Sequence, residues 1–484
     1  MTLWLPLLLP LAGAIVVLAF KHHRTAVRVA LAIGCTEVLL LGACALKVHA
    51  RGVLQQGRYL RADGLTLLFL LNLALIFIVV LAYSAGYLRH IPKGRFSSPR
   101  WYYALLFLFL FTMIGAYLSA NLGMLWIAIE ATTLASALLV GFYNTKGAVE
   151  AGWKYLIVCT VGIAFALFGT IALYLAAVRG GIPADAALDW TALMSAAQGM
   201  AKAHDLVKLA FVFAVVGYGT KIGFVPMHSW LPDAHAEAPA PISAMLSAAL
   251  LNCAMYALLR WDAIISHAIG AGFSHTLLLT FGSLSLLVAV FLMIVQRDLK
   301  RLLAYSSIEH MGIVALGVGI GGPLGLFGAL LHAFNHSLAK TLLFFTSGRV
   351  RDSFSTLRMD RIRGMGRAIP FTAAVLIIGG VAIVGLPPFG LFVSEFAILM
   401  AAFISSRYLL AALMLIAFSI GFGALFYHFQ RMLTGEPKAP LANSILRRSE
   451  VAAICACSIC LLVLGLCIPP AFTSIIHSAM AVLQ

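Results

Sequence analysis

Long, continuous apolar runs organise this chain, and several of them contain an isolated ionisable residue. Of the 484 residues, 62% are hydrophobic and 10% are charged, whereas a soluble domain carries about 25% charged residues. The runs reach about 18 residues or more, which suffices for a helix to cross a bilayer, and they lack the alternating pattern of a transmembrane β-strand. We therefore predict an all-α, polytopic membrane protein.

The apolar runs predict about fourteen transmembrane helices. The first run has no positively charged stretch before it and no evident cleavage site, so we interpret it as a retained span rather than a signal peptide. The spans run approximately over 3–20, 26–48, 64–88, 101–119, 121–142, 152–178, 207–227, 241–261, 273–295, 301–320, 322–347, 370–402, 406–430 and 450–470.

The basic residues lie mostly between these spans and act as topology signals. Loops after odd-numbered spans hold 21 Lys and Arg, against eight in loops after even-numbered spans. The positive-inside rule then places both termini on the non-cytoplasmic side of the cell (inner) membrane. Although the net charge is +16, no soluble basic domain is available to hold a duplex, so we expect no nucleic-acid partner.

Two opposite charges stand within separate apolar runs. Glu130 lies in Leu122–Val140 and Lys221 lies in Val207–Val225. An ionisable side chain at bilayer depth is costly and normally marks an ion path, a relay or a binding site. Each charge lowers the cost of burying the other, and a buried lysine shifts its pKa readily. We predict a Glu–Lys proton relay, with a purely structural ion pair as the alternative.

A later run carries a stripe of titratable residues. His332, His336 and Lys340 are spaced i, i+4, i+8, so they lie within about 80° on one helix face, and Glu395 lies in the following apolar run. Histidine titrates near physiological pH, so such a stripe favours proton transfer. The two histidines would suit zinc, but no carboxylate or cysteine completes their face, so we predict no metal site.

Three further polar residues have open roles. Asn252 cannot titrate but can order water or accept a hydrogen bond. Glu309 and His310 open the tenth predicted span, where they are either functional or part of a solvated helix end. We treat all three as candidate relay or water-ordering residues.

Proline and glycine predict that the seventh and twelfth helices are broken. Pro226 follows Lys221, and Pro387 and Pro388 precede Glu395; proline removes a backbone donor and clashes one turn back. The breaks are five spans apart, which predicts two five-helix inverted repeats, spans 4–8 and 9–13. The predicted units are helices 1–3 in 1–100, the first repeat in 101–262, the second repeat in 263–432 and a C-terminal helix in 433–484.

No motif for a cofactor is evident in the sequence. There is no P-loop, no G-x-G-x-x-G after a strand and no haem signature. Cys455, Cys457 and Cys460 form a C-x-C-x-x-C string, but it lies within the last apolar run. The eight cysteines fall in apolar runs and lack His or acidic helpers. We expect no cofactor in this chain.

Five stretches resemble the antiporter-like membrane subunits of respiratory complex I, Mrp cation/proton antiporters and membrane-bound [NiFe] hydrogenases. The matching stretches are W-I-A-I-E-A-T-T-L-A-S-A-L-L-V-G, G-T-K-I-G-F-V-P-M-H-S-W-L-P-D-A-H, D-L-K-R-L-L-A-Y-S-S-I-E-H-M-G, H-A-F-N-H-S-L-A-K-T-L-L-F-F and G-L-P-P-F-G-L-F-V-S-E-F. Within the family, the first and third look most like component F of hydrogenase-4 and formate hydrogenlyase-type complexes.

The resemblance implies a function and roles for particular residues. Glu130 and Lys221 would be the family's fifth-helix glutamate and seventh-helix lysine, and Glu395 its twelfth-helix ionisable residue. The eighth-helix lysine of several complex I members falls on Asn252, so water or the histidines would bridge that position.

The resemblance also implies partners. The chain would be a non-catalytic, proton- or sodium-translocating subunit of a redox-driven complex in the lipid bilayer, with other membrane subunits. Peripheral [NiFe] hydrogenase or dehydrogenase subunits would carry the iron–sulfur clusters. The alternatives are a subunit of a complex I-type quinone oxidoreductase or of an Mrp-type antiporter, and a non-conducting membrane scaffold.

Overall fold

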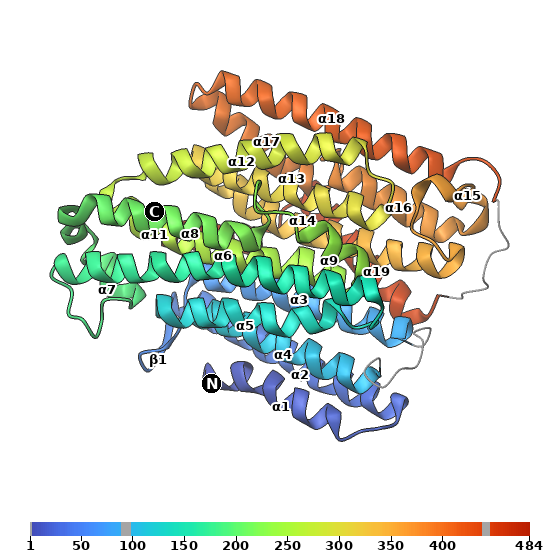
Figure 1. Cartoon of the computed structure of the whole chain (residues 1–484), viewed down its shortest axis with the longest axis horizontal. Helices are drawn as coiled ribbons and strands as arrows, with labels where there is room; N and C mark the ends of the chain where they lie inside the picture. Colours follow the sequence, from blue (N-terminus) through green and yellow to red (C-terminus); the bar gives the residue numbers. More distant parts are fainter. Residues whose placement is uncertain (1, 89–97, 438–445) are drawn as a thin grey trace.

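The chain forms an elongated bundle in which most helices run parallel or antiparallel to one another (Figure 1). The computed structural model describes residues 2–88, 98–437 and 446–484. The long helices are α1 (Trp4–Leu18), α2 (His23–Arg51), α3 (Gly64–Tyr87), α4 (Pro99–Leu118), α5 (Leu122–Val140), α6 (Lys146–Arg179), α8 (His204–Ile222), α11 (Leu251–Ile269), α12 (Ala271–Ile294), α13 (Leu299–Ile320), α14 (Gly322–Phe354), α16 (Pro370–Ile383), α17 (Gly390–Ile404), α18 (Tyr408–Leu433), α19 (Arg448–Leu466) and α20 (Pro470–Leu483). The short ones are α7 (Trp190–Ser195), α9 (Leu231–Glu237), α10 (Ala240–Met245) and α15 (Met365–Ala368), with 3-10 turns at Ala197–Ala203 and Met359–Arg361.

The predicted all-α membrane fold is confirmed. Among the described residues, ten helices are long and apolar enough to cross a membrane, and four shorter apolar helices accompany them. The helices α8 and α14 are long but fall outside both groups. The helix α8 carries three charged residues, Asp205, Lys208 and Lys221, and the buried polar residues of α14 lower its hydropathy. The total of fourteen spans stays a prediction.

Both predicted helix breaks are confirmed. The helix α8 ends at Ile222, where Gly223 takes the left-handed conformation (φ 88°), and Pro226 lies in the turn before α9. The helices α16 and α17 are separated at Gly385 (φ 66°), with Pro387 and Pro388 in the connection. Glycine adopts positive φ without steric cost, so each break begins at a residue suited to it.

A further irregularity lies in the eighth span, which the sequence predicted as a regular helix. Between α10 and α11, the segment Leu246–Leu250 is π-helical. Every residue in the apolar 18-residue stretch of Ala240–Ile269 is buried inside the bundle. A π-turn inserts one residue and is frequently found at functional sites, and here it directly precedes Asn252. No glycine or proline marks it, so the sequence carried no signal for it.

The last predicted span, 450–470, matches a helix long and apolar enough to cross a membrane, but a further helix follows it. The helix α19 ends at Leu466, and α20 resumes at Pro470 and continues to Leu483. Glu450 lies against Gly86 and Ser478 lies against Gly64, at opposite ends of α3. The two helices therefore follow α3 as one interrupted element, and the prediction ended at the interruption because proline stops the apolar run.

Both chain ends lie at the same end of the bundle, the left in Figure 1. A small antiparallel hairpin at this end, β1 (Leu54–Gln56) with β2 (Leu60–Ala62), is the only sheet in the described part of the chain. The backbone N–H of Leu3 donates to Gln56 Oε1 at 2.5 Å. This arrangement agrees with an even number of spans; the membrane side of the termini stays a prediction.

Three cations that we counted as loop residues lie within buried helices. They are Arg260 in α11, Lys300 in α13 and Arg349 in α14, because these helices extend beyond their apolar runs. Arg260 donates to Asp63 Oδ1 at 2.7 Å. Burial raises the pKa of the Asp63 carboxyl, but the charge and hydrogen bond of Arg260, the Thr66 N–H and the Arg61 charge together outweigh burial and hold this pKa below its ordinary value. Four other counted cations, Arg89, Lys93, Arg95 and Lys438, lie outside the described residues.

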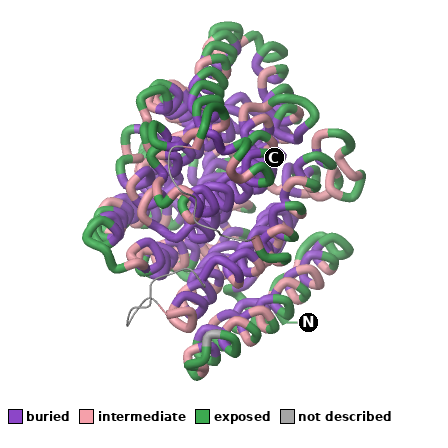
Figure 2. The backbone as a smooth tube through the Cα atoms, turned by 90° about the vertical axis from the view of Figure 1, so that its right-hand side faces the viewer, coloured by how far each residue is buried: buried purple, intermediate pink, exposed green. Residues whose placement is uncertain are grey.

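Buried residues gather in the centre of the bundle and exposed residues form its rim (Figure 2). In the apolar 18-residue stretch of each helix, 94% of the α13 residues are buried, whereas 33% are buried in each of α2, α18 and α19. The exposed rim contains large apolar side chains such as Ile127, Leu134 and Phe168, as expected where helices face hydrocarbon. The inward-facing polar residues therefore lie deep within protein.

Candidate functional site

Lys221 is the centre of a hydrogen-bonded group that we call the lysine cluster: Glu130, Thr133, Tyr155 and Lys221. Lys221 is completely buried on the last turn of α8. Its ammonium donates to the Thr133 hydroxyl of α5 and, at 3.1 Å, to the Tyr155 hydroxyl of α6. Three helices therefore converge on this one cation.

The two hydroxyl groups that accept from Lys221 donate their own hydrogen bonds to further acceptors. Tyr155 contacts Ser136 Oγ at 2.7 Å, and Ser136 Oγ donates to Thr132 O; the tyrosine hydroxyl must therefore donate to Ser136 and accept from Lys221. Thr133 Oγ1 donates to Glu130 Oε2 over a long contact of 3.4 Å. The cluster thus presents oriented acceptors to Lys221 and links it to a carboxylate.

Glu130 and Lys221 are not in direct contact in the described structure, so the structural ion pair that we gave as the alternative does not form. Thr133 bridges them, because it lies three residues after Glu130 on the same face of α5. The other Glu130 oxygen accepts from Thr160 Oγ1 at 2.8 Å. Glu130 is only partly buried and Thr160 is exposed, so this end of the lysine cluster reaches the rim of the bundle.

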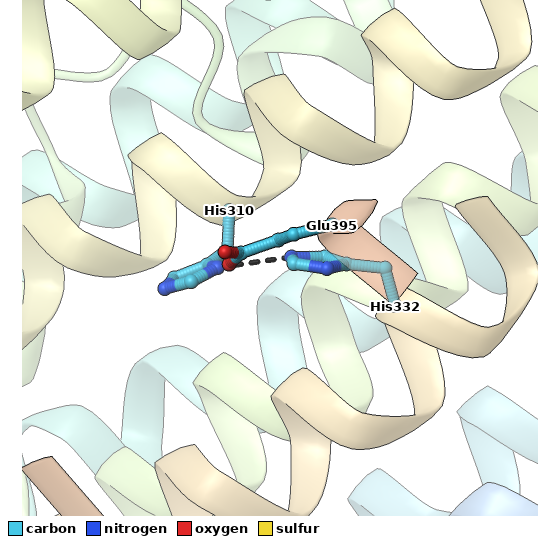
Figure 3. A group of neighbouring side chains, drawn as sticks. All are labelled: His310, His332 and Glu395. Carbon is cyan, nitrogen blue, oxygen red and sulfur yellow. Dashed lines mark hydrogen bonds between the residues drawn. The ribbon is translucent and has the colours of Figure 1, made fainter. Parts of the chain in front are cut away.

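The second group, the histidine cluster, comprises His310, His332, His336, Ser394 and Glu395. His310 Nδ1 and His332 Nε2 are 2.9 Å apart (Figure 3). His332 Nδ1 lies 3.0 Å from Ser394 Oγ. Ser394 Oγ donates to Leu391 O, so it accepts from His332 Nδ1–H. With neutral rings, His310 Nδ1–H then donates to His332 Nε2.

Glu395 reaches this histidine pair from the broken twelfth helix, as Figure 3 shows. One carboxylate oxygen and one ring nitrogen each of His310 and His332 lie within 4.8 Å of one another. A side-chain carbon at position 385 would lie 1.9 Å from Glu395 Oε2, so only glycine at the break allows the carboxylate to occupy this place.

The fold supplies the carboxylate that we expected to be missing from a metal site. Two histidines and a glutamate are a donor set that zinc accepts. The direct bond between His310 and His332, however, already engages two of their ring nitrogens. We therefore interpret the group as a hydrogen-bonded cluster, and the absence of a metal stays a prediction.

Several buried polar atoms on or beside α13 and α14 have no protein partner in the described part of the chain. They include His310 Nε2, both ring nitrogens of His336 and of His235, and both amide atoms of Asn335. The His310 and His336 rings lie 5.3 Å apart. Such atoms are ordinarily satisfied by internal water, so this region is suited to hold water between its titratable groups.

Lys340 and Glu309 extend the histidine cluster. Lys340 is completely buried and donates to Leu303 O at 2.8 Å. Glu309 and His310 are both buried within α13, which begins ten residues before Glu309, at Leu299. The alternative of a solvated helix end is therefore wrong for both residues: the actual helix begins earlier than its apolar run.

Asn252 lies between the two clusters and is tightly held. Its Nδ2 donates to Ser337 Oγ at 2.8 Å and to the carbonyls of Ala248 and Ala333. Ser337 also accepts from Asn72 of α3 at 2.9 Å. The Asn252 amide thus joins the π-helical segment to α14, while its buried Oδ1 has no described protein partner and is available to water.

Sequence reasoning missed the hydroxyl groups that connect the ionisable residues. Thr133 could have been found from its i, i+3 spacing to Glu130, and Ser394 from its position beside Glu395. Tyr155, Thr160 and the buried His235 carried no comparable signal, because only the packing of separate helices brings them to the clusters.

The chain belongs to the family described as NADH:quinone oxidoreductase/Mrp antiporter, transmembrane, whose model matches residues 119–421. It is 42% identical over 391 residues to a hydrogenase-4 component F homolog of Methylacidiphilum infernorum, covering 79% of this chain and 80% of that relative. The predicted resemblance to antiporter-like subunits, with hydrogenase-4 component F among them, is confirmed. The protein is a multi-pass membrane protein of this antiporter-like class.

Solved structures share the fold. A chain of the archaeal membrane-bound sulfane sulfur reductase superposes with a TM-score of 0.88 at 23% identity, covering 99% of this chain and 97% of that chain. A chain of respiratory complex I from Thermus thermophilus superposes with a TM-score of 0.81 at 23% identity, covering all of both chains.

Proposed function

We propose that this protein is the proton-translocating membrane subunit of a redox-driven complex of the hydrogenase-4 or formate hydrogenlyase type. Its place is the cell membrane, beside other membrane subunits. Peripheral [NiFe] hydrogenase or dehydrogenase subunits carry the iron–sulfur clusters, and this chain holds no cofactor of its own. The family and the name of the 42% identical relative support this proposal.

The observation that carries the translocation proposal is the chain of contacts from Lys221 through Thr133 to Glu130. A buried lysine exchanges its proton readily because burial opposes its charge. The Thr133 hydroxyl takes a proton from the ammonium as it gives its own proton to the Glu130 carboxylate, and rotation of the hydroxyl then resets the link for the next proton. Lys221 stands on the last turn before a helix break, where a small change in the turn moves its ammonium.

Protons fit these clusters better than sodium ions. Sodium, a hard cation, is bound by oxygen ligands such as carboxylates and carbonyls. Here the buried centres are two lysines, three histidines and the two carboxylates Glu309 and Glu395. The nitrogens, which outnumber the carboxylates, hold protons, and an ammonium repels a second cation. The histidine cluster continues the path with groups that titrate near neutral pH.

The ion is tested with the assembled complex reconstituted in vesicles. We expect electron transfer to acidify or alkalinise the lumen at the same rate with and without sodium, and a protonophore to abolish the signal. A translocation signal that requires sodium and survives the protonophore would show that the translocated ion is sodium and not the proton. A complex that transfers electrons without any ion movement would favour the scaffold alternative.

The partner subunits are tested separately. Affinity purification of the tagged chain from its native membrane, followed by mass spectrometry, should recover hydrogenase large and small subunits with other membrane subunits. Recovery of Mrp antiporter components, without any redox subunit, would assign the chain to the antiporter alternative instead.

A further inference from the structure

An apolar groove runs along the outer face of the bundle between α16 and α18. Its volume is about 300 Å³. The walls are aliphatic and aromatic, and the only polar side chains on them, Gln430 and Thr434, lie at one end. The groove is separate from the lysine and histidine clusters and no step of the proposed relay uses it.

The groove has the length and direction of one bilayer leaflet. One end lies at Val384 and Leu386, beside the break halfway along the twelfth span, and the other lies at Leu433 and Thr434, where α18 ends. The wall from Phe422 to Thr434 is about 18 Å long at 1.5 Å per residue. Half of a bilayer's hydrocarbon core is about 15 Å thick, so an acyl chain fits along it.

The end of the groove at Leu433 and Thr434, which we call its outer end, is bordered by cations. Arg363 NH1 donates to the carbonyl of Arg431 at 2.9 Å, and Gly364 N donates to Thr434 O at 2.9 Å. This segment continues to Arg367, whose side chain is 76% exposed and faces Glu436 at 3.6 Å. An exposed ion pair of this kind is weak, so the Arg367 guanidinium can exchange Glu436 for a phosphate, while Arg363 uses one of its terminal nitrogens for the Arg431 carbonyl and brings its charge to the same end of the groove.

We propose that this groove binds one acyl chain of an anionic phospholipid whose phosphate contacts Arg363 and Arg367. The positive charge at the outer end favours an anionic headgroup. The apolar walls favour an acyl chain, which a free phosphate ion does not have. Juxtamembrane arginines attract anionic lipids in this way.

The site adjoins the break in the twelfth span. Val384 and Leu386 line the groove and flank Gly385, and the backbone of Gly385 touches the Glu395 carboxylate. A bound chain packs against the break from one side while Glu395 contacts it from the other. The lipid thus stabilises the position of the twelfth-helix break.

The test is fluorescence quenching by brominated lipids in the reconstituted, assembled complex. The variant Phe426→Trp places a reporter in the groove, because Phe426 lines it and is 57% exposed. Its added fluorescence, relative to the wild type, should be half-quenched at about tenfold lower mole fraction of brominated phosphatidylglycerol than of brominated phosphatidylcholine. The binding readout does not depend on ion translocation.

Two controls make the result specific. Ile416→Trp, on α18 outside the groove and 60% exposed, should be quenched equally by both lipids. Arg363→Gln with Arg367→Gln, added to Phe426→Trp, should abolish the headgroup preference, whereas Arg407→Gln at the opposite end of α18 should not. Equal quenching of Phe426→Trp by both lipids would overturn the proposal. So would an unquenched reporter, which would instead identify the groove as a contact with a neighbouring subunit.

Discussion

The two polar clusters of this bundle satisfy their hydrogen bonds in different ways. In the lysine cluster, the hydroxyls of Thr133 and Tyr155 receive the Lys221 protons and pass their own protons to protein acceptors. In the histidine cluster, His310 and His336 keep ring nitrogens without a described protein partner. The first cluster is organised by protein and reaches the rim; the second is deeper and depends on internal water.

This difference predicts how each cluster responds to substitution. Removing Lys221 takes away the proton-carrying nitrogen on which the lysine cluster converges, and no other member of that cluster can substitute for it. Removing one from the histidine cluster leaves space that water enters, so partial function remains. The following experiments test this contrast, beginning with the largest expected effect.

Lys221→Met should reduce proton translocation at least about 100-fold, because it removes the group that exchanges the proton. Methionine keeps the apolar stem, so the protein should still insert. The measurement is the initial rate in vesicles at matched complex content. Lys208→Met, on the same helix and over the Phe273 ring, is the control and should retain full activity. An active Lys221→Met complex would remove the lysine cluster from the mechanism.

His332→Ala and Glu395→Gln should each reduce translocation about tenfold, since each change breaks one contact of a chain that water partly restores. Because the two residues act as one unit, the double variant should be little worse than the worse single variant. The measurement is the initial translocation rate of each variant in the same vesicles. Losses that multiply would show that His332 and Glu395 serve separate functions.

Thr133→Val should reduce translocation about three- to tenfold, the value of one hydrogen bond in the link between Lys221 and Glu130. Thr133→Ser should restore the rate, because serine keeps the hydroxyl. The matched control is Thr132→Val, since Thr132 donates only to the carbonyl of Ile129 on its own helix. Equal rates for Thr133→Val and the wild type would show that the bridge is not used.

Asn252→Ala should affect stability more than transport. It removes the contacts of the Asn252 amide N–H groups with Ala248 O in the π-helical segment and with Ala333 O and Ser337 Oγ of α14, which costs about 1–3 kcal/mol. Thermal unfolding in detergent should therefore occur at a lower temperature, with a translocation rate within about twofold of the wild type, because water can occupy the vacated volume. Unchanged unfolding with lost transport would assign Asn252 to the relay itself.

The sequence predicted the membrane fold, both helix breaks and the ionisable residues, because hydropathy, proline and isolated charge are local signals. It did not reveal the π-helical segment before Asn252, which no proline or glycine marks, or the continuation of the chain in α20 beyond Pro469. The hydroxyl partner Tyr155 was also missed, since its role arises only when α6 packs against α8. The inverted repeats and their boundaries stay predictions.

The central claim is that the two clusters lie in series on one proton path. Its most direct test is the initial translocation rate of the double variant Thr133→Val/His332→Ala, compared with both single variants at matched complex content. In a series path the slowest step sets the rate, so the double variant should run within about twofold of the slower single variant. If each single variant retains at least half of the wild-type rate while the double variant retains almost none, the clusters form parallel paths and the claim is wrong.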